Sequence, residues 1–300
     1  MSAGGYSGID MSTLPAPAVV EVLDYETILA EMVADLQERD PSFSALVESD
    51  PAYKILEVAA FRETLLRQRV NEAALAVLLP HASGTDLENL AALSDVERLL
   101  ITPGDPDAFP PVAAVYEEDE SLRRRAQLAV EGQTVAGSSG AYIFHSLGVA
   151  GVKDACPDSS SPGVVEVYIL ALDGDGTPSP ELLASVDAVL SPKEVRPLTD
   201  NVDVQAAAIV NYTIEATLHM ESGPDAAVAV AAARAELDKV VASSHSLGGR
   251  GLAISAIHKA LHQPGVVKVA LTSPANDLAP TISQALYCTS ITINEVPVDG

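Results

Sequence analysis

The spacing of apolar side chains predicts a long amphipathic helix between residues 51 and 79. Asp50 and Pro51 favour its start, because an aspartate oxygen can accept hydrogen bonds from free amides and proline suits the first helical position. Pro80 favours its end. Six apolar residues, here called the helical seam, recur at intervals of three or four, interrupted by Glu63: Leu56, Ala59, Leu66, Val70, Ala73 and Val77.

The helical seam predicts that this helix packs against another helix. At 1.5 Å per residue, a helix of about 28 residues would be ~40 Å long, which is longer than a compact domain of this size needs. We therefore expect part of the apolar surface to contact another chain. The alternative is a helix bundle formed within this chain alone.

The remaining pattern predicts an α+β protein: an N-terminal helical, bundle-forming region followed by two small α/β domains in which helices pack on a sheet. A further helix is predicted over residues 25–39, and another after Thr85, which has the spacing of a capping box with Glu88. Strict alternation of apolar and polar residues over 208–219 predicts a strand with one packed face and one solvated face.

Turn-forming residues suggest where the regions meet. Residues 102–111 contain four prolines and a glycine, which disfavour a helix or a central strand. The predicted parts are a flexible arm over 1–18, a helical assembly region over 19–100, a proline-rich linker over 101–114, an α/β domain over 115–200 and an α+β sandwich-like domain over 201–300. A helix followed by Gly-Val at Gly151 and again at Gly265 leaves internal duplication open.

Composition excludes several classes of function. The chain has 17 basic and 42 acidic residues, a net charge of −25, which repels phosphate; we expect no direct nucleic-acid binding. No stretch approaches the length of an uninterrupted apolar membrane span, so we expect none. Three adjacent arginines, Arg123, Arg124 and Arg125, cannot share one helical face, and we expect them to form ion pairs or a protein contact.

The motifs that resemble catalytic or metal sites are incomplete. His258 and His262 have the spacing of two zinc ligands, but Lys259 occupies the position where a zinc-protease helix needs a glutamate. Residues 173–176 resemble the start of a calcium loop but lack its later glycine and glutamate. The glycines and serines of 137–140 lack the spacing of a nucleophile elbow. We therefore expect no catalytic, cofactor-binding or metal residues and no enzyme activity.

Several segments, taken together and in order, resemble the baseplate J-like family. The resemblance extends from residue 20 to residue 295, although His81 stands where an alanine is more usual. The segments that carry it are 49–57, 61–63, 69–74, 81–91, 118–125, 136–142, 162–167 and 195–200.

The resemblance implies a structural wedge subunit in the baseplate of a contractile phage tail or a related injection particle. Such a subunit assembles around the central hub and links neighbouring wedges into a ring. The implied partners are other wedge proteins, of the tail protein I-like and sheath-initiator-like kinds, and copies of the same chain. The implied place is the baseplate of a virion or tail-like particle, after synthesis in the host cytoplasm.

Two other functions remain as alternatives. A tail-associated cell-wall hydrolase would need a catalytic cluster, and the sequence motifs provide none. A peripheral host-binding protein would be expected to have repetitive β-structure and an aromatic-rich tip, whereas aromatic residues make up 4% of this chain. Structural assembly through the helical seam is therefore the leading prediction.

Overall fold

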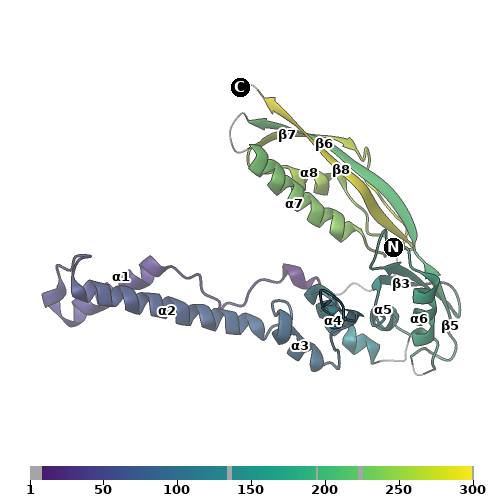
Figure 1. Ribbon diagram of the computed structural model, residues 1–300, viewed down its shortest axis with the longest axis horizontal. Helices are drawn as coiled ribbons and strands as arrows, with labels where there is room; N and C mark the ends of the chain where they lie inside the picture. Colours follow the sequence, from purple (N-terminus) through teal and green to yellow (C-terminus); the bar gives the residue numbers. More distant parts are fainter. Residues whose placement is uncertain (1–8, 134–136, 194, 222–225, 299–300) are drawn as a thin grey trace. The chain divides into compact units, whose positions relative to one another are not determined.

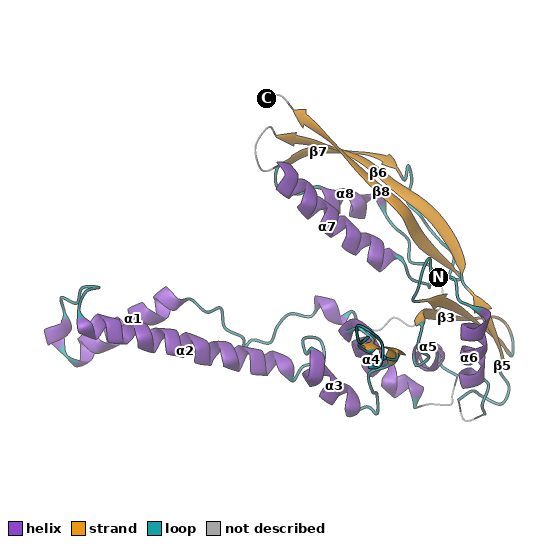
Figure 2. Ribbon diagram, viewed as in Figure 1, coloured by secondary structure: helices purple, strands orange, loops and turns teal. Residues whose placement is uncertain are grey.

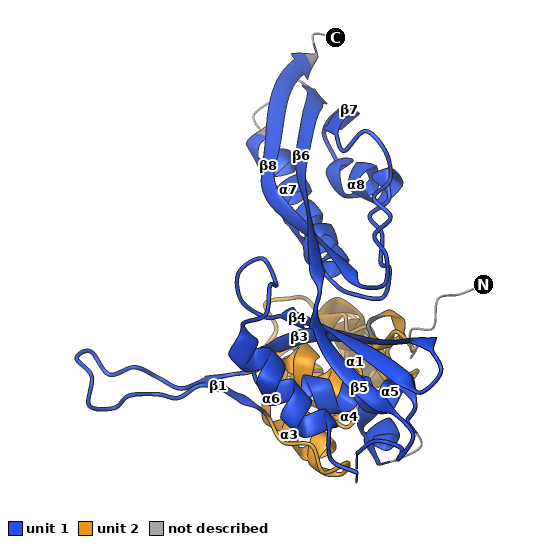
Figure 3. Cartoon of the chain, turned by 90° about the vertical axis from the view of Figure 1, so that its right-hand side faces the viewer, with its two compact units in different colours: residues 1–7, 99–116, 127–300 blue, residues 8–98, 117–126 orange. Residues whose placement is uncertain are grey.

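The computed structural model describes residues 9–133, 137–193, 195–221 and 226–298. It contains two compact units (Figure 3). Among the described residues, one is a helical unit of residues 9–98 and 117–126, and the other comprises the described residues of 99–116 and 127–298 and contains the sheets. The predicted α+β architecture, with helices preceding sheet-containing regions, is confirmed. Residues 1–8 of the predicted flexible arm lie outside the described part of the chain.

The helical unit is built around one long helix (Figures 1 and 2). Its elements are η1 (Met11–Thr13), α1 (Tyr25–Arg39), η2 (Pro41–Phe43), α2 (Pro51–Ala76), α3 (Gly84–Ala92) and the first part of α4 (Asp119–Gly132). Helix α1 has the predicted bounds, and Asp24 caps it by accepting a hydrogen bond from the Thr27 amide at 3.2 Å. Helix α2 ends slightly before the predicted limit.

Two predicted caps are wrong. The Asp50 carboxylate makes no cap hydrogen bond to α2 and instead accepts one from the Val47 amide at 3.0 Å. At α3 the expected capping box is absent because the helix begins at Gly84, which places Thr85 inside its first turn; Arg98 binds Glu88 at 2.6 Å. The Gly84 amide at the start of α3 instead donates to Asp119, 35 residues later in the chain.

The proline-rich segment forms a hairpin rather than the expected linker over 101–114. Strands β1 (Leu100–Thr102) and β2 (Val115–Tyr116) pair antiparallel, and Asp105 and Val112 exchange backbone hydrogen bonds of 2.9 Å further along. Prolines fit here because the tip of a two-stranded ribbon needs few ladder bonds. The hairpin returns the chain to the helical unit at residue 117.

The first three-stranded sheet has the order β3-β4-β5. Strand β4 pairs antiparallel with β3 and parallel with β5, and buried Val167 and Ile169 lie at its centre. The elements here are α5 (Ser139–Leu147), β3 (Val152–Ser161), β4 (Val164–Ala171), α6 (Pro180–Leu190) and β5 (Asn201–Ala206). Because β5 belongs to this sheet, the predicted domain boundary at 200/201 falls too early.

The second sheet has the order β7-β6-β8, with α7 and α8 on one face (Figures 1 and 2). Its elements are β6 (Ala208–Glu221), α7 (Ala226–Ser244), α8 (Ile254–Leu261), β7 (Val266–Ser273) and β8 (Gln284–Val298). The predicted alternation along β6 is confirmed: Ile214 and Leu218 are fully buried against the helices, whereas Glu215 between them is exposed.

The two sheets share a pairing pattern. In each, the central strand has one antiparallel and one parallel neighbour. Gly151 and Gly265 precede the antiparallel strands with φ of +93° and +92°, a conformation that favours glycine. The order of elements along the chain differs between the sheets, so the shared pattern does not decide the question of internal duplication.

The two sheets are joined by one residue of the chain and by a buried hydrogen bond. Only Ala207 lies between β5 and β6, and its side chain is buried. The buried carboxylate of Asp154 on β3 accepts hydrogen bonds from the amides of Ala155 at 2.9 Å and Leu247 at 2.8 Å. The Leu247 bond joins the loop after α7 to the first sheet.

Candidate assembly surface

Helix α2 presents a broad apolar face to solvent. The side chains of Leu66 and Val70 are 66% and 58% exposed. We define the α2 face as the exposed apolar residues Val58, Phe61, Leu65, Leu66, Val70, Ala73 and Val77. Four of them belong to the predicted helical seam. A monomeric soluble protein rarely exposes so many large apolar side chains along one helix, and such faces commonly bind other proteins.

The opposite side of α2 packs within the unit. Ile28 and Leu29 of α1 form a small core with fully buried Ala60 of α2, and Tyr53 and Leu56 pack against it. Leu56, the first seam residue, therefore contributes to the core of this chain, and Ala59 is half-buried. Helix α1 thus covers the first half of α2 and leaves the later seam residues exposed.

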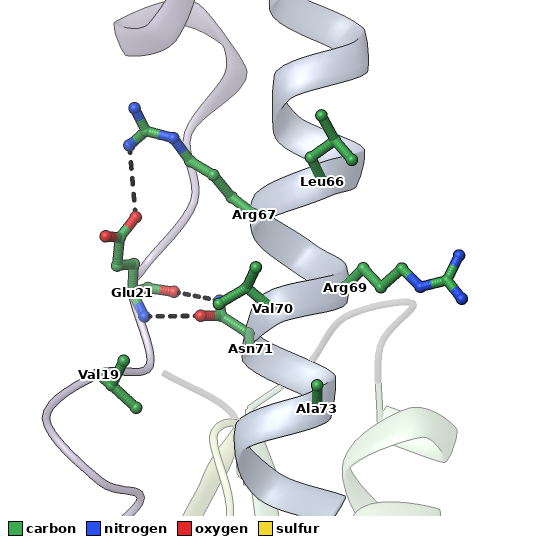
Figure 4. Close-up of a pocket in the computed structure, with 8 residues that line it drawn as sticks. All are labelled: Val19, Glu21, Leu66, Arg67, Arg69, Val70, Asn71 and Ala73. Carbon is green, nitrogen blue, oxygen red and sulfur yellow. Dashed lines mark hydrogen bonds and ion pairs between the residues drawn. The ribbon is translucent and has the colours of Figure 1, made fainter.

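Asn71 attaches the segment before α1 to the second half of α2 (Figure 4). Its side-chain amide donates to the Glu21 carbonyl at 2.8 Å, and its side-chain oxygen accepts from the Glu21 amide at 3.0 Å. The residue is 7% exposed. This reciprocal pair satisfies both backbone groups of Glu21, much as a neighbouring β-strand would. Sequence analysis missed it, because the partners are 50 residues apart and a single asparagine in a helix is not distinctive.

A hollow of 410 Å³ lies between this segment and the α2 face (Figure 4). Val19, Leu66, Val70 and Ala73 supply apolar walls. At one side, Arg67 bridges Glu21 at 3.3 Å and also pairs with Glu63. The hollow is large enough for several side chains, and its walls suit apolar ones.

Replacing Asn71 by leucine should detach the segment around Glu21 from α2. Leucine has a similar volume but can neither donate nor accept, so two hydrogen bonds are lost, each with a net value of about 1 kcal/mol. We expect faster amide hydrogen exchange at Glu21, with α1 and the rest of α2 unchanged. Asn89→Leu, at an exposed position on α3, is the control. Unchanged exchange at Glu21 would contradict the proposed role of Asn71.

Two arginines lie within the α2 face. Arg62 and Arg69 are exposed and fall on the same side of the helix as Leu66 and Ala73, at spacings of three and four residues. In Figure 4, the Arg69 side chain points away from the Glu21 segment. In a chain of net charge −25 these cations give the α2 face a local positive character.

Arginines also fix the end of α2 to α4. Arg98 binds Glu88 and Asp119, both at 2.6 Å, and Arg123 donates to the carbonyls of Leu79 and Ala82 in the α2–α3 turn. The hydrogen bond from the Gly84 amide lowers the pKa of Asp119 most, and the hydrogen bond from Arg98 lowers it further. The predicted structural role is thus confirmed for Arg123, and the turn after α2 is held by several charged groups.

The motifs considered for chemistry belong to the sheet-containing unit. His262 follows the last residue of α8, so it does not continue the helical face of His258. Ser138 caps α5 by accepting from the Ala141 amide at 3.1 Å. Within the described residues there is no group of three His, Cys, Asp or Glu side chains placed to hold a metal ion. Nor does any helix in that part of the chain have the length and apolarity to cross a bilayer.

Comparison with known proteins matches nearly the whole chain. The baseplate J-like N-terminal domain matches residues 48–105, the baseplate J-like central domain residues 134–206 and the baseplate J-like protein C-terminal domain residues 212–294. Baseplate protein J of Escherichia phage P2 is 44% identical over 289 residues, which cover 94% of this chain and 95% of that protein. With three consecutive domain matches and a full-length relative, this chain belongs to the baseplate J-like family.

Proposed function

We propose that the protein is a wedge subunit of a contractile-tail baseplate and that its α2 face binds helices of neighbouring baseplate proteins. A structural role in a tail baseplate follows from family membership. The observation that carries the finer proposal is the α2 face itself, which α1 leaves uncovered. Burying it against partner helices would remove several large apolar side chains from water, each contributing about 1.5–3 kcal/mol when fully buried.

The proposed assembly places wedges around the central hub and links them into a ring through contacts between copies. The proposed partners are tail protein I-like and sheath-initiator-like subunits, together with other copies of this chain. The protein would be made in the host cytoplasm and reside in the baseplate of the particle. In this role the chain acts by binding, without a catalytic step.

The partner helix on the α2 face is expected to be apolar with acidic flanks. Arg62 and Arg69 lie among the apolar side chains, so a partner carrying glutamate or aspartate at matching positions would pair with them. A basic partner would face two unpaired cations. Charge complementarity of this kind discriminates between partners more than it adds affinity.

Co-expression of the chain with the other baseplate proteins of its particle tests the proposal. We expect them to be isolated together with an affinity-tagged chain, and the amides of residues 61–77 to exchange more slowly in the complex than in the free chain. The amides around Leu198, an exposed residue of the sheet-containing unit, serve as the internal reference. Isolation of the tagged chain alone, or equal exchange over 61–77 in both states, would overturn the proposal.

A further inference from the structure

The segment before α1 is attached to α2 chiefly by polar contacts. Asn71 binds both backbone groups of Glu21, at 2.8 and 3.0 Å, and Arg67 binds the Glu21 carboxylate at 3.3 Å. No residue from 13 to 24 is buried, and Val19 is 57% exposed. The small core shared by α1 and α2 includes none of these residues. The segment therefore contributes little to the apolar packing of the helical unit.

This segment stands beside the part of the α2 face that α1 leaves open. Val19 and Glu21 form one wall of the 410 Å³ hollow. The other wall belongs to α2 and includes Leu66, Val70 and Ala73 (Figure 4). A helix about 10 Å across rises about 5.4 Å per turn, so one turn occupies about 400 Å³, and Leu66 to Ala73 span about two turns. A partner helix packed along them would need about twice the room of the hollow, and the segment would obstruct it.

We propose that residues 18–22, here called the clasp, restrict access to this half of the α2 face in the free chain and detach when a partner helix binds. The clasp is then an autoinhibitory contact. The proposal rests on the proposed function, because it concerns how partners reach the α2 face. Val58 and Phe61 of the same face do not line the hollow and are more than half exposed, so a partner can contact them before the clasp detaches.

The contacts of the clasp are of a kind that water can replace. When the clasp detaches, the Asn71 amide and the backbone of Glu21 become hydrated, so each lost hydrogen bond changes the equilibrium by about fivefold. The exposed pair of Arg67 and Glu21 adds about fivefold at most. Arg67 keeps its second partner, Glu63, at 2.5 Å. Together these contacts favour the attached state by about 25- to 125-fold, so the clasp is released in about 1–4% of free chains.

The reciprocal pair explains why α2 carries a nearly buried asparagine. The carboxamide of Asn71 binds the main chain of the clasp and places no demand on its side chains. Apolar faces of this size commonly bind other proteins, and unprotected ones promote aggregation. A clasp that yields to a helix matching the α2 face would limit binding by other apolar surfaces.

Binding of the full-length chain to the tail protein I-like subunit of its particle, measured by surface plasmon resonance, tests the clasp. Glu21→Pro removes the amide that Asn71 binds and leaves α2 unchanged. We expect its apparent dissociation constant to be about fivefold lower than that of wild type, because the released fraction rises. Asn71→Leu removes both hydrogen bonds and should lower the constant about 10- to 20-fold. A purely structural role of these residues would weaken binding instead.

Ala18→Pro is the matched control within the clasp. The Val20 amide donates to the Pro17 carbonyl at 3.0 Å, so Ala18 takes the second position of a turn, which suits proline. Both backbone groups of Glu21 remain, and binding should equal that of wild type. The melting temperatures of both proline variants should match wild type, because neither replaced residue is buried.

Hydrogen exchange at Glu21 distinguishes the clasp from the proposed function. In the complex the Glu21 amide should exchange faster than in the free chain, while the amides of residues 61–77 exchange more slowly. Equal or slower exchange at Glu21 in the complex, or equal or weaker binding by Glu21→Pro, would overturn the clasp. Slower exchange over 61–77 would then leave the proposed function standing. If wild type binds no partner and exchange over 61–77 is unchanged, both proposals are overturned.

Discussion

Leu66→Asp is expected to abolish incorporation of the protein into assembled tails while leaving the isolated chain folded. In the free chain Leu66 is 66% exposed, so an aspartate there remains solvated. Against a partner helix the same carboxylate would be buried without a cation, at a cost of several kcal/mol. Each 1.4 kcal/mol weakens binding about tenfold, so assembly should fail at ordinary protein concentrations. Particle yield by electron microscopy measures the effect, and thermal unfolding of the pure variant confirms its fold.

Val70→Asp should behave like Leu66→Asp, because Val70 lies one helical turn further along the same face. Leu198→Asp is the matched control: this leucine is 81% exposed and belongs to the sheet-containing unit rather than to α2. It should give wild-type particle yield. Normal yield with Leu66→Asp or Val70→Asp would show that the α2 face stays solvated in the particle.

Arg125→Met is expected to destabilise the helical unit by about 3–5 kcal/mol, because it leaves the Glu117 carboxylate buried without its cation. The two side chains are 8% and 2% exposed, and Arg125 also donates to the Glu97 carbonyl at 3.0 Å. Methionine fills a similar volume, which isolates the loss of charge from the loss of packing. Urea unfolding followed by circular dichroism measures the change.

Two further variants distinguish the loss of the buried ion pair from the effect on stability of replacing any arginine. Arg62→Met removes an exposed arginine from the same unit and should change stability by about 0.5 kcal/mol or less. Glu117→Leu combined with Arg125→Met removes both buried charges, and we expect it to recover part of the loss of the single variant. If Arg125→Met were as stable as Arg62→Met, the buried pair would have no structural importance.

Elements defined by local pattern could be predicted from the sequence. Helix α1 has the predicted bounds, and β6 has the predicted buried face. In each case a short stretch of sequence is sufficient, because apolar residues that recur every 3.6 residues indicate a helix and those that recur every 2 residues indicate a strand. The α+β fold class could be predicted from the order of these helices and strands along the chain.

Elements that depend on distant partners could not be predicted. Strand β3 contains Asp154, Pro157 and Asp158 and shows no alternation, so its pairing with β4 determines its structure. Strand β5 was not predicted, and the domain boundary was placed before it, because nothing in its six residues indicates that it pairs with β4. At α3 a tertiary partner, Asp119, binds the Gly84 amide, whereas at α2 the Asp50 carboxylate binds the Val47 amide before the helix.

The candidate surface was predicted in part. The spacing of Leu66, Val70, Ala73 and Val77 identified a helical stripe, and the structure leaves these residues exposed. Periodicity alone could not separate Leu56, which packs against α1, from the exposed residues further along. Their contact with another chain stays a prediction. The hollow beside Asn71 depends on a contact across 50 residues and left no local signal.

The single residue between β5 and β6 has a mechanical consequence. Ala207 is buried, and the Asp154–Leu247 hydrogen bond adds a second, non-covalent tie between the sheets. A hinge needs several residues whose torsion angles are free to change, and one buried alanine provides almost none. In the proposed contractile tail, we expect the two sheets to rotate together as one rigid body. A rotation of one sheet would then be transmitted fully to the other.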